Sequence, residues 1–490
     1  MTALDTLFEF DATTSALSQV MGRLHWDQET MMPAGAAEQR AEEIAALESV
    51  LHARRQDPRI GDWLAAADPK SPADAARLAL LQRDYDRAVR VPADLASALA
   101  RTTSRGQGVW VAARRDEDVA AFLPILTEIV ALKREAATAL ADGGDLYDAL
   151  VEDYEPGLTG AEIAAMFDRM RPRLVALRGR ILGSGRTAPE LSGAFSHAKQ
   201  LQLTQKVAET FGYNFDRGRI DLAVHPFSSG SGTDVRITTR VDEADPFGAL
   251  YSTIHEVGHA AYEQHVAAEF ALTRLGSGVS MGVHESQSRM FENQLGRSAA
   301  FCGWLRGEMH SVFGTFDPSD AAGFYAAVNA VRQGFIRTES DEVQYNLHIM
   351  LRFDLERALM RGDLAVADLE EAWNTRFAAD FGVSVDRPSN GMLQDVHWAA
   401  GLFGYFPTYS LGNVYAGCLH QALRGDIPDL DAQMAAGDLS APTRWLAEKV
   451  QRHGSALSPK IVIEAATGAE ISEAPLLNYL DEKFDALYGT

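Results

Sequence analysis

The sequence contains little cysteine: Cys302 and Cys418 are the only two among 490 residues. Two thiols so far apart provide no disulfide framework, which favours a reducing compartment, and we expect the cytoplasm. The N-terminal segment has neither the positive nor the apolar region of a signal peptide. No apolar run approaches the roughly 20 residues that a membrane-spanning helix needs, so no membrane association is expected.

Positive charge is also scarce, with 45 Lys and Arg against 68 Asp and Glu, which gives a formal net charge of −23. A surface this acidic repels phosphates, which argues against nucleic acid or an anionic membrane as a partner. The hydrophobic share of 46% is that of an ordinary globular protein, and this length provides ample material for a large core.

Most of the chain shows helical periodicity, which is clearest at 36–53, 73–88, 117–141 and 160–183. One region, about 220–241, differs: segments 220–227 and 234–241 are rich in β-branched residues and flank a Ser- and Gly-rich turn, which predicts a β-hairpin. Directly afterwards, Asp245 and Pro246 have the pattern of an N-cap followed by proline at the first helical position. A helix over about 246–267 is therefore expected.

That helix carries the motif His255-Glu256-Val257-Gly258-His259. Histidines at i and i+4 project from one helical face and can share a tetrahedral ion. Glu256 points away from that pair and can act as general base towards a water whose pKa the metal lowers. Chance would give about 0.02 such motifs in this composition. We therefore predict a catalytic zinc site, one ion per chain.

A third protein ligand is required, and spacing does not identify it. His265 is excluded because a continuous helix places it about 15 Å along the axis from His255. Glu263 also points too far up that helix from His255. A carboxylate on a following helix is the alternative geometry, and Glu285 is well placed to begin one. The full set of candidates is Glu263, Glu269, His284, Glu285 and Glu292.

A second polar stripe lies within 336–357, where a helix would align Asp341, Tyr345, His348 and Arg352 on one face. Apolar residues surround the stripe, which favours a polar face inside a groove over a solvated surface. An arginine there could bind a C-terminal carboxylate through two hydrogen bonds. Downstream, Tyr405 or Tyr409 could stabilise an oxyanion, although core packing explains isolated aromatics equally well.

Several motifs in order resemble the carboxypeptidase Taq family of zinc metallocarboxypeptidases, nearly end to end. Ser340 stands where alanine is more usual in the fifth motif. The matching segments are Trp26-Asp27-Gln28-Glu29-Thr30 with Met32-Pro33, His225-Pro226-Phe227, Asp234-Val235-Arg236-Ile237-Thr238, His284-Glu285-Ser286-Gln287, Ile336-Arg337-Thr338-Glu339-Ser340-Asp341, and the GMLQDVHW run ending at Trp398.

The resemblance implies a mainly α-helical, neurolysin-like zincin fold: one peptidase domain, 1–490, with two helical halves across a deep groove and a small β-sheet beside it. It implies Glu285 as third ligand, with Co²⁺ a possible substitute for zinc, and a homodimer. The implied activity is the release of single C-terminal residues from peptides, with broad preference and poor tolerance of proline. We place Arg352, Arg236, His348, Tyr405 and His225 among the substrate-binding residues, and Tyr409 as oxyanion donor.

Two alternatives remain at this point. An oligopeptidase would cut internal bonds of short peptides in the same groove. A catalytically inactive, helical peptide-binding protein would keep zinc only for stability.

Overall fold

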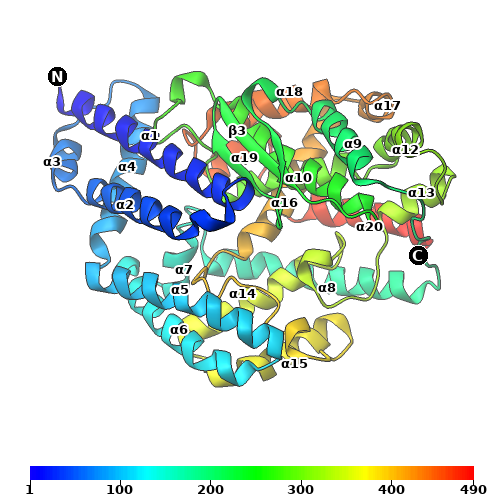
Figure 1. Ribbon diagram of the computed structural model, residues 1–490, viewed down its shortest axis with the longest axis horizontal. Coiled ribbons are helices and arrows are strands. Elements are labelled where there is room, and N and C mark those ends of the chain that lie inside the picture. The colour runs from blue at the N-terminus through cyan, green and yellow to red at the C-terminus, as the bar shows by residue number, and fades with distance from the viewer. The chain divides into compact units, whose positions relative to one another are not determined.

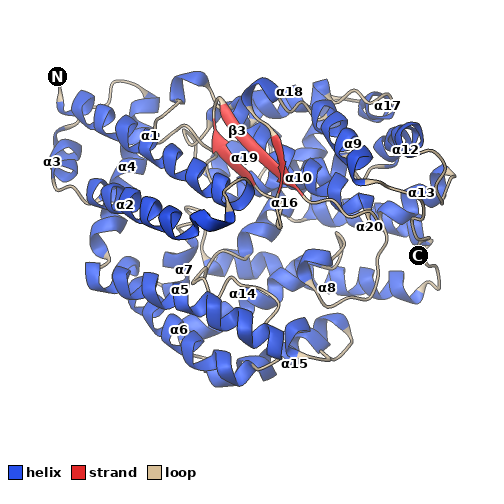
Figure 2. Ribbon diagram, viewed as in Figure 1, coloured by secondary structure: helices blue, strands red, loops and turns tan.

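The computed structural model describes residues 1–490 and is built almost wholly of helices, with one small sheet (Figure 2). This confirms the expected mainly α fold. The chain divides into two units, each assembled from three segments of the sequence. Unit 1 comprises Met1–Ala88, Ala188–Asn329 and Tyr415–Ile471, and unit 2 comprises Val89–Thr187, Ala330–Val414 and Ser472–Thr490. The groove expected between two helical halves stays a prediction.

Unit 1 contains the sheet and most of the helices (Figure 1). Two helices are divided between the units: α4 (Pro72–Arg90) belongs to unit 1 up to Ala88, and α16 (Pro407–Asp426) belongs to unit 1 from Tyr415 onwards. The elements of unit 1 are α1 (Ala3–Thr30), α2 (Ala37–Arg55), α3 (Arg59–Ala66), α4 (Pro72–Arg90), α9 (His197–Thr210), β1 (Ile220–Leu222), β2 (Ser228–Ser231), β3 (Asp234–Thr239), α10 (Pro246–His265), α11 (Met281–Arg289), α12 (Ala299–Phe313), α13 (Ala321–Val328), α17 (Leu430–Ala435), α18 (Ser440–Lys449) and α19 (Pro459–Thr467).

The sheet has the order β1-β3-β2, which corrects the expected hairpin. The antiparallel partner of β3 is β2, which lies inside the segment expected to be the turn, while β1 pairs with β3 in parallel on the other side. Gly232 adopts a positive φ of 64°, which allows a two-residue turn between Ser231 and Asp234. A hairpin is therefore present, but its first strand lies closer to the turn than predicted. β-propensity does not indicate this strand, because serine and glycine are poor strand formers.

Helix α10 forms the centre of unit 1 and begins as expected. The Asp245 carboxylate accepts a hydrogen bond from the Phe247 amide at 3.1 Å, and Pro246 occupies the first helical position. Leu250, Ile254 and Val257 have no exposed surface. The helix packs against β2, β3, α9 and α11. Because these neighbours surround it, α10 is fixed in position and can present side chains accurately.

Unit 2 is entirely helical. Within it, α14 begins only at Tyr345, which corrects the helix expected from 336: Asp341 precedes the helix, and its side chain accepts hydrogen bonds from the amides of Val343 and Gln344. The elements are α5 (Ala93–Asp116), α6 (Val119–Ala141), α7 (Leu146–Val151), α8 (Gly160–Gly183), α14 (Tyr345–Arg361), α15 (Leu369–Phe381), the first part of α16, and α20 (Ala474–Tyr488).

The four amphipathic helices read from the sequence correspond to α2, α4, α6 and α8. None of the helices combines the length and the apolar character that crossing a membrane requires.

Candidate metal centre

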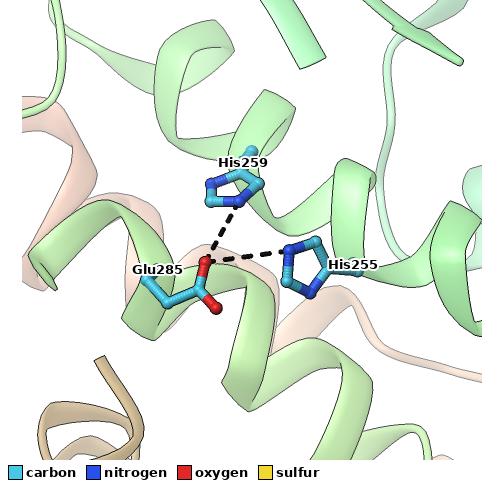
Figure 3. Close-up of side chains that lie close together, drawn as sticks. All are labelled: His255, His259 and Glu285. Carbon is cyan, nitrogen blue, oxygen red and sulfur yellow. Dashed lines mark ion pairs between the residues drawn. The ribbon is translucent and has the colours of Figure 1, made fainter. Parts of the chain in front are cut away.

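The two histidines of α10 and one carboxylate of α11 converge on a single point (Figure 3). The Nε2 atoms of His255 and His259 lie 3.7 and 3.4 Å from the Glu285 Oε2 atom, and the donor atoms of all three residues lie within 4.8 Å of one another. Ligand atoms about 2.0–2.1 Å from a shared tetrahedral ion lie roughly 3.3 Å apart, which is close to these separations. The three residues therefore fit one divalent cation.

Gly258 determines how closely the two helices of the site approach. A Cβ atom at this position would lie 2.4 Å from the Ser288 Cα atom and 2.7 Å from the Gln287 carbonyl oxygen. Both are backbone atoms of α11, so a side chain could not be accommodated by a rotamer change. The absence of a Cβ between the two histidines thus lets the helix that carries Glu285 pack directly on α10.

A π-helical turn, Met290–Leu295, continues α11 and supplies a second carboxylate to the site. The Glu292 Oε2 atom lies 3.0 Å from the His255 Nδ1 atom, on the opposite side of the ring from the Nε2 atom that faces Glu285. Arg289 lies between the two acids: its Nε donates to Glu285 at 2.6 Å and its Nη1 to Glu292 at 3.2 Å. Glu292 thereby fixes the orientation of the His255 ring.

The arginine keeps both carboxylates ionised in spite of their burial. Burial alone would raise the pKa of Glu292, but the charges of Arg289 and His255 outweigh it and lower the pKa to about 2. The pKa of Glu285 is lowered in the same way, against burial, by Arg289 and His255. A cation placed here would therefore meet anionic oxygen without first displacing a proton.

Glu256 has the opposite electrostatic environment. Burial raises its pKa to about 7, an effect that His255 opposes and that the negative charges of Glu285 and Glu292 reinforce. It is 7% exposed and follows a histidine of the cluster directly in sequence. A carboxyl group with a pKa near neutrality can both accept and return a proton, as general acid–base catalysis requires.

Comparison with known proteins identifies the family. The model of the carboxypeptidase Taq (M32) metallopeptidases matches residues 6–484. The chain is 40% identical to thermostable carboxypeptidase 1 of Thermus thermophilus, over 99% of both chains, and 33% identical to carboxypeptidase 1 of Bacillus subtilis, over 98% of both. The crystal structure of the M32 carboxypeptidase from Deinococcus radiodurans superposes with a TM-score of 0.96, at 38% identity and full coverage of both chains.

The chain belongs to the carboxypeptidase Taq family. It is a peptidase of the metallocarboxypeptidase type.

Four other residues of unit 1 that the sequence suggested as site residues or weighed as metal ligands are not part of the His255, His259 and Glu285 cluster. Arg236 on β3 binds its neighbour Asp234 through two hydrogen bonds of 2.7 and 3.0 Å and lies over the Trp26 ring. His225 is exposed in the bend between β1 and β2. His265 is the last residue of α10 and lies 2.8 Å from Gln451. Glu269 is exposed in a 3₁₀ turn.

Arg352 lies in a buried ionic cluster of unit 2. Its side chain has no exposed surface, and its Nε donates to the Asp395 carboxylate at 2.7 Å. Arg337 binds the same carboxylate through Nη2 at 2.8 Å and donates from Nη1 to the Tyr345 hydroxyl at 3.0 Å. Two cations therefore share one anion. A guanidinium without exposed surface cannot touch a ligand in this conformation, so Arg352 can act on one only through its charge.

The remaining residues of unit 2 differ in accessibility. His348 is fully buried against Phe381, and burial, with the charge of Arg352, holds its pKa well below the ordinary value, so it is neutral and out of reach of a ligand. Tyr405 and Tyr409 are half-buried, with ring centroids 5.3 Å apart. The Tyr409 hydroxyl lies 3.3 Å from the His397 Nε2 atom. Tyr409 is thus oriented by a neighbour, as a hydrogen-bond donor requires.

The sequence does not predict the contacts of three buried or half-buried residues of these two clusters. The sequence predicts Glu292 only as a candidate metal ligand, because its position behind His255 depends on the π-helical turn. Arg337 and Asp395 lie inside the last two motifs of the family resemblance, but no local pattern predicts that they pair across 58 residues. The available signal was one basic residue, Arg337, and one acidic residue, Asp395, in two separate motifs.

Proposed function

We propose that this family member is a zinc-dependent carboxypeptidase that releases single amino acids from the C-termini of peptides. The observation that carries the proposal is the convergence of His255, His259 and Glu285, with Glu256 beside them. Two imidazoles and one carboxylate are a donor set of catalytic zinc sites, and they leave a fourth position for water or substrate. Co²⁺ accepts the same set. Broad side-chain preference and poor cleavage at proline follow from the family resemblance.

When bound, the ion supplies a Lewis acid that polarises the scissile carbonyl and lowers the pKa of water. Glu256 takes one proton from the attacking water while the oxygen of that water forms a bond to the carbonyl carbon. The same carboxyl group then passes that proton to the amine nitrogen as the C–N bond breaks. Tyr409, oriented by His397, donates a hydrogen bond to the oxyanion of the tetrahedral intermediate.

The variant Glu256→Gln tests the general base. Glutamine keeps the size of the side chain but cannot accept the proton, so kcat is expected to fall by at least about 10²-fold. Zinc content, measured by mass spectrometry of the native protein, should stay at one ion per chain. Loss of zinc together with activity would instead assign Glu256 to the metal shell, and near-full activity would exclude it as the base.

We further propose that the Arg337–Asp395–Arg352 cluster attracts the substrate carboxylate. Two guanidinium groups and one carboxylate leave one positive charge, because burial and the arginines lower the pKa of the adjacent His397 to about 4 and keep it neutral. Arg352→Met removes that surplus and should raise KM for free-acid peptides more than for the same peptides with C-terminal amides. Equal changes in both KM values would remove the cluster from carboxylate recognition.

The two alternatives make different predictions. An oligopeptidase would give internal fragments of a decapeptide in mass spectrometry, whereas a carboxypeptidase gives a ladder of stepwise C-terminal losses. In a protein with a purely structural zinc, chelation would unfold the chain; in the enzyme it should abolish activity while the helical circular dichroism stays. The homodimer and the cytoplasmic location stay predictions, the first of which sedimentation analysis can check.

A further inference from the structure

Two candidate ligands that the proposed chemistry does not use form a chain behind one metal ligand. His284 precedes Glu285 on α11, and its Nδ1 atom lies 2.7 Å from the Nδ1 atom of His259. On the other side of the same ring, the His284 Nε2 atom lies 3.0 Å from Glu263 Oε1. Glu263 is one helical turn beyond His259 on α10, so α10 supplies both ends of the chain and α11 its middle.

The hydrogen bonds of this chain determine the position of every proton. The His259 Nε2 atom faces the metal position, so in the metal-binding form it carries no proton and Nδ1 carries it instead. That Nδ1–H group can bond only to an unprotonated Nδ1 of His284. A His284 ring that accepts this bond at Nδ1 carries its proton on Nε2, from which it can donate to Glu263. Each step follows from the one before, and the carboxylate at the end selects the tautomer of both rings.

The surroundings hold the chain in place. The Gly278 amide donates to the Glu263 Oε1 atom at 2.9 Å, and the Glu263 side chain is only 8% exposed. The Tyr262 ring packs against that of His284, with 5.1 Å between centroids. A Cβ at Gly278 would lie 2.7 Å from the His284 ring, so glycine leaves the space that this ring occupies.

The two metal histidines are thus oriented in different ways. His255 has a carboxylate, Glu292, directly behind its Nδ1 atom. Behind His259, the equivalent carboxylate acts through an inserted imidazole. We propose that His284 is a positioning residue that holds the His259 Nε2 atom towards the metal, and that Glu263 fixes His284 in the tautomer this requires. The proposal rests on the metal site proposed above.

Groups in this position typically contribute 10- to 100-fold to metal affinity. The experiment measures the zinc dissociation constant of each purified, metal-free variant by competition with a chelating dye. His284→Phe keeps a flat ring without either nitrogen and should raise the zinc Kd by roughly 10- to 100-fold. His284→Asn keeps an acceptor near the position of Nδ1 and should lose less. Glu263→Gln keeps an acceptor for His284 without the charge and should also lose less than His284→Phe.

Two controls separate the possible results. His52→Phe changes an exposed histidine of α2 and should leave the zinc Kd unchanged. His259→Ala should abolish high-affinity binding, and if it does not, the metal site itself is wrong. If His259→Ala abolishes binding while folded His284→Phe stays within twofold of the wild-type Kd, only the positioning role is overturned. Should His284→Phe not fold, the double variant His284→Asn/Glu263→Gln decides. A zinc Kd within twofold of the wild-type value refutes the proposal, and a Kd raised by roughly 10-fold or more supports it.

Discussion

Asp395 is the single anion between two buried arginines, and its replacement by asparagine should destabilise unit 2 severely. The Arg352 and Arg337 side chains are 0% and 7% exposed. Removing one partner of a buried ion pair costs about 3–5 kcal/mol, because the other charge is left without compensation. Asp395→Asn leaves two such charges, so the upper end of that range is expected.

Arg352→Met is the matched control, since it leaves Arg337 and Asp395 as a one-to-one pair. It loses the hydrogen bond from Nη1 to the His348 carbonyl oxygen and the contact with the Trp373 ring, and should cost about 1–3 kcal/mol. The smaller side-chain change is therefore predicted to be the more damaging one. That order distinguishes charge imbalance from loss of packing, which would give the reverse.

The assay is amide hydrogen exchange of α14 peptides, which reports opening of this region separately from unit 1. A cost of 3–5 kcal/mol corresponds to about 10²- to 10⁴-fold faster exchange. The arginines lower the pKa of Asp395 against the effect of burial. The contribution of the ionised carboxylate to the free energy of unfolding is therefore complete above about pH 4 and is lost only in stronger acid. The deficit of Asp395→Asn should thus be constant from pH 5 to 8. An Asp395→Asn variant that exchanges no faster than Arg352→Met would refute the reasoning.

Two further predictions follow from single positions. Gly258→Ala should separate α10 from α11, because its Cβ meets backbone at 2.4 Å. We expect a loss of at least about 2 kcal/mol in thermal unfolding and a zinc Kd raised more than stability alone explains. The control Gly303→Ala adds a Cβ in open space on α12, so it should leave the zinc Kd unchanged and raise stability by up to about 1 kcal/mol. Burial raises the pKa of Glu356 to about 7, against hydrogen bonds from Gly404, Tyr147 and Trp398. The folded state therefore holds this proton more tightly, and stability falls by roughly 2–4 kcal/mol as pH rises from about 4.5 to 7. Glu356→Gln should abolish that slope in hydrogen exchange of α14, and an unchanged slope would contradict the assignment.

Local patterns predicted those elements whose causes are local. The start of α10 followed from a capping aspartate and a proline, and α2, α4, α6 and α8 followed from apolar periodicity. The beginning of α14 was missed because Asp341 competes for backbone amides, which interrupts a pattern that periodicity alone would continue. The sheet was misjudged because β2 consists of serine and glycine, and its pairing depends on β3 rather than on its own propensity.

In the candidate site, too, the sequence predicts features with a local cause and not those that depend on packing between helices. The distance between His255 and His259 is a property of one helix, and the sequence was sufficient to predict it. Choosing among His284, Glu285 and Glu292 was not possible from spacing, because all three lie close to the two histidines and differ in which ring nitrogen they approach. That choice depends on the rotation of α11 against α10.

The contact at Gly258 links that rotation to the sequence. With the Ser288 backbone lying where a Cβ would be, α11 can approach α10 only along the face between the two histidines. Glu285 is three residues before Ser288 and Glu292 four residues after it, so one contact places a carboxylate at each end of the His255 ring. The glycine of the motif is therefore as informative as its histidines: it determines which helix face meets them, and hence which acid faces the metal and which one orients the ring.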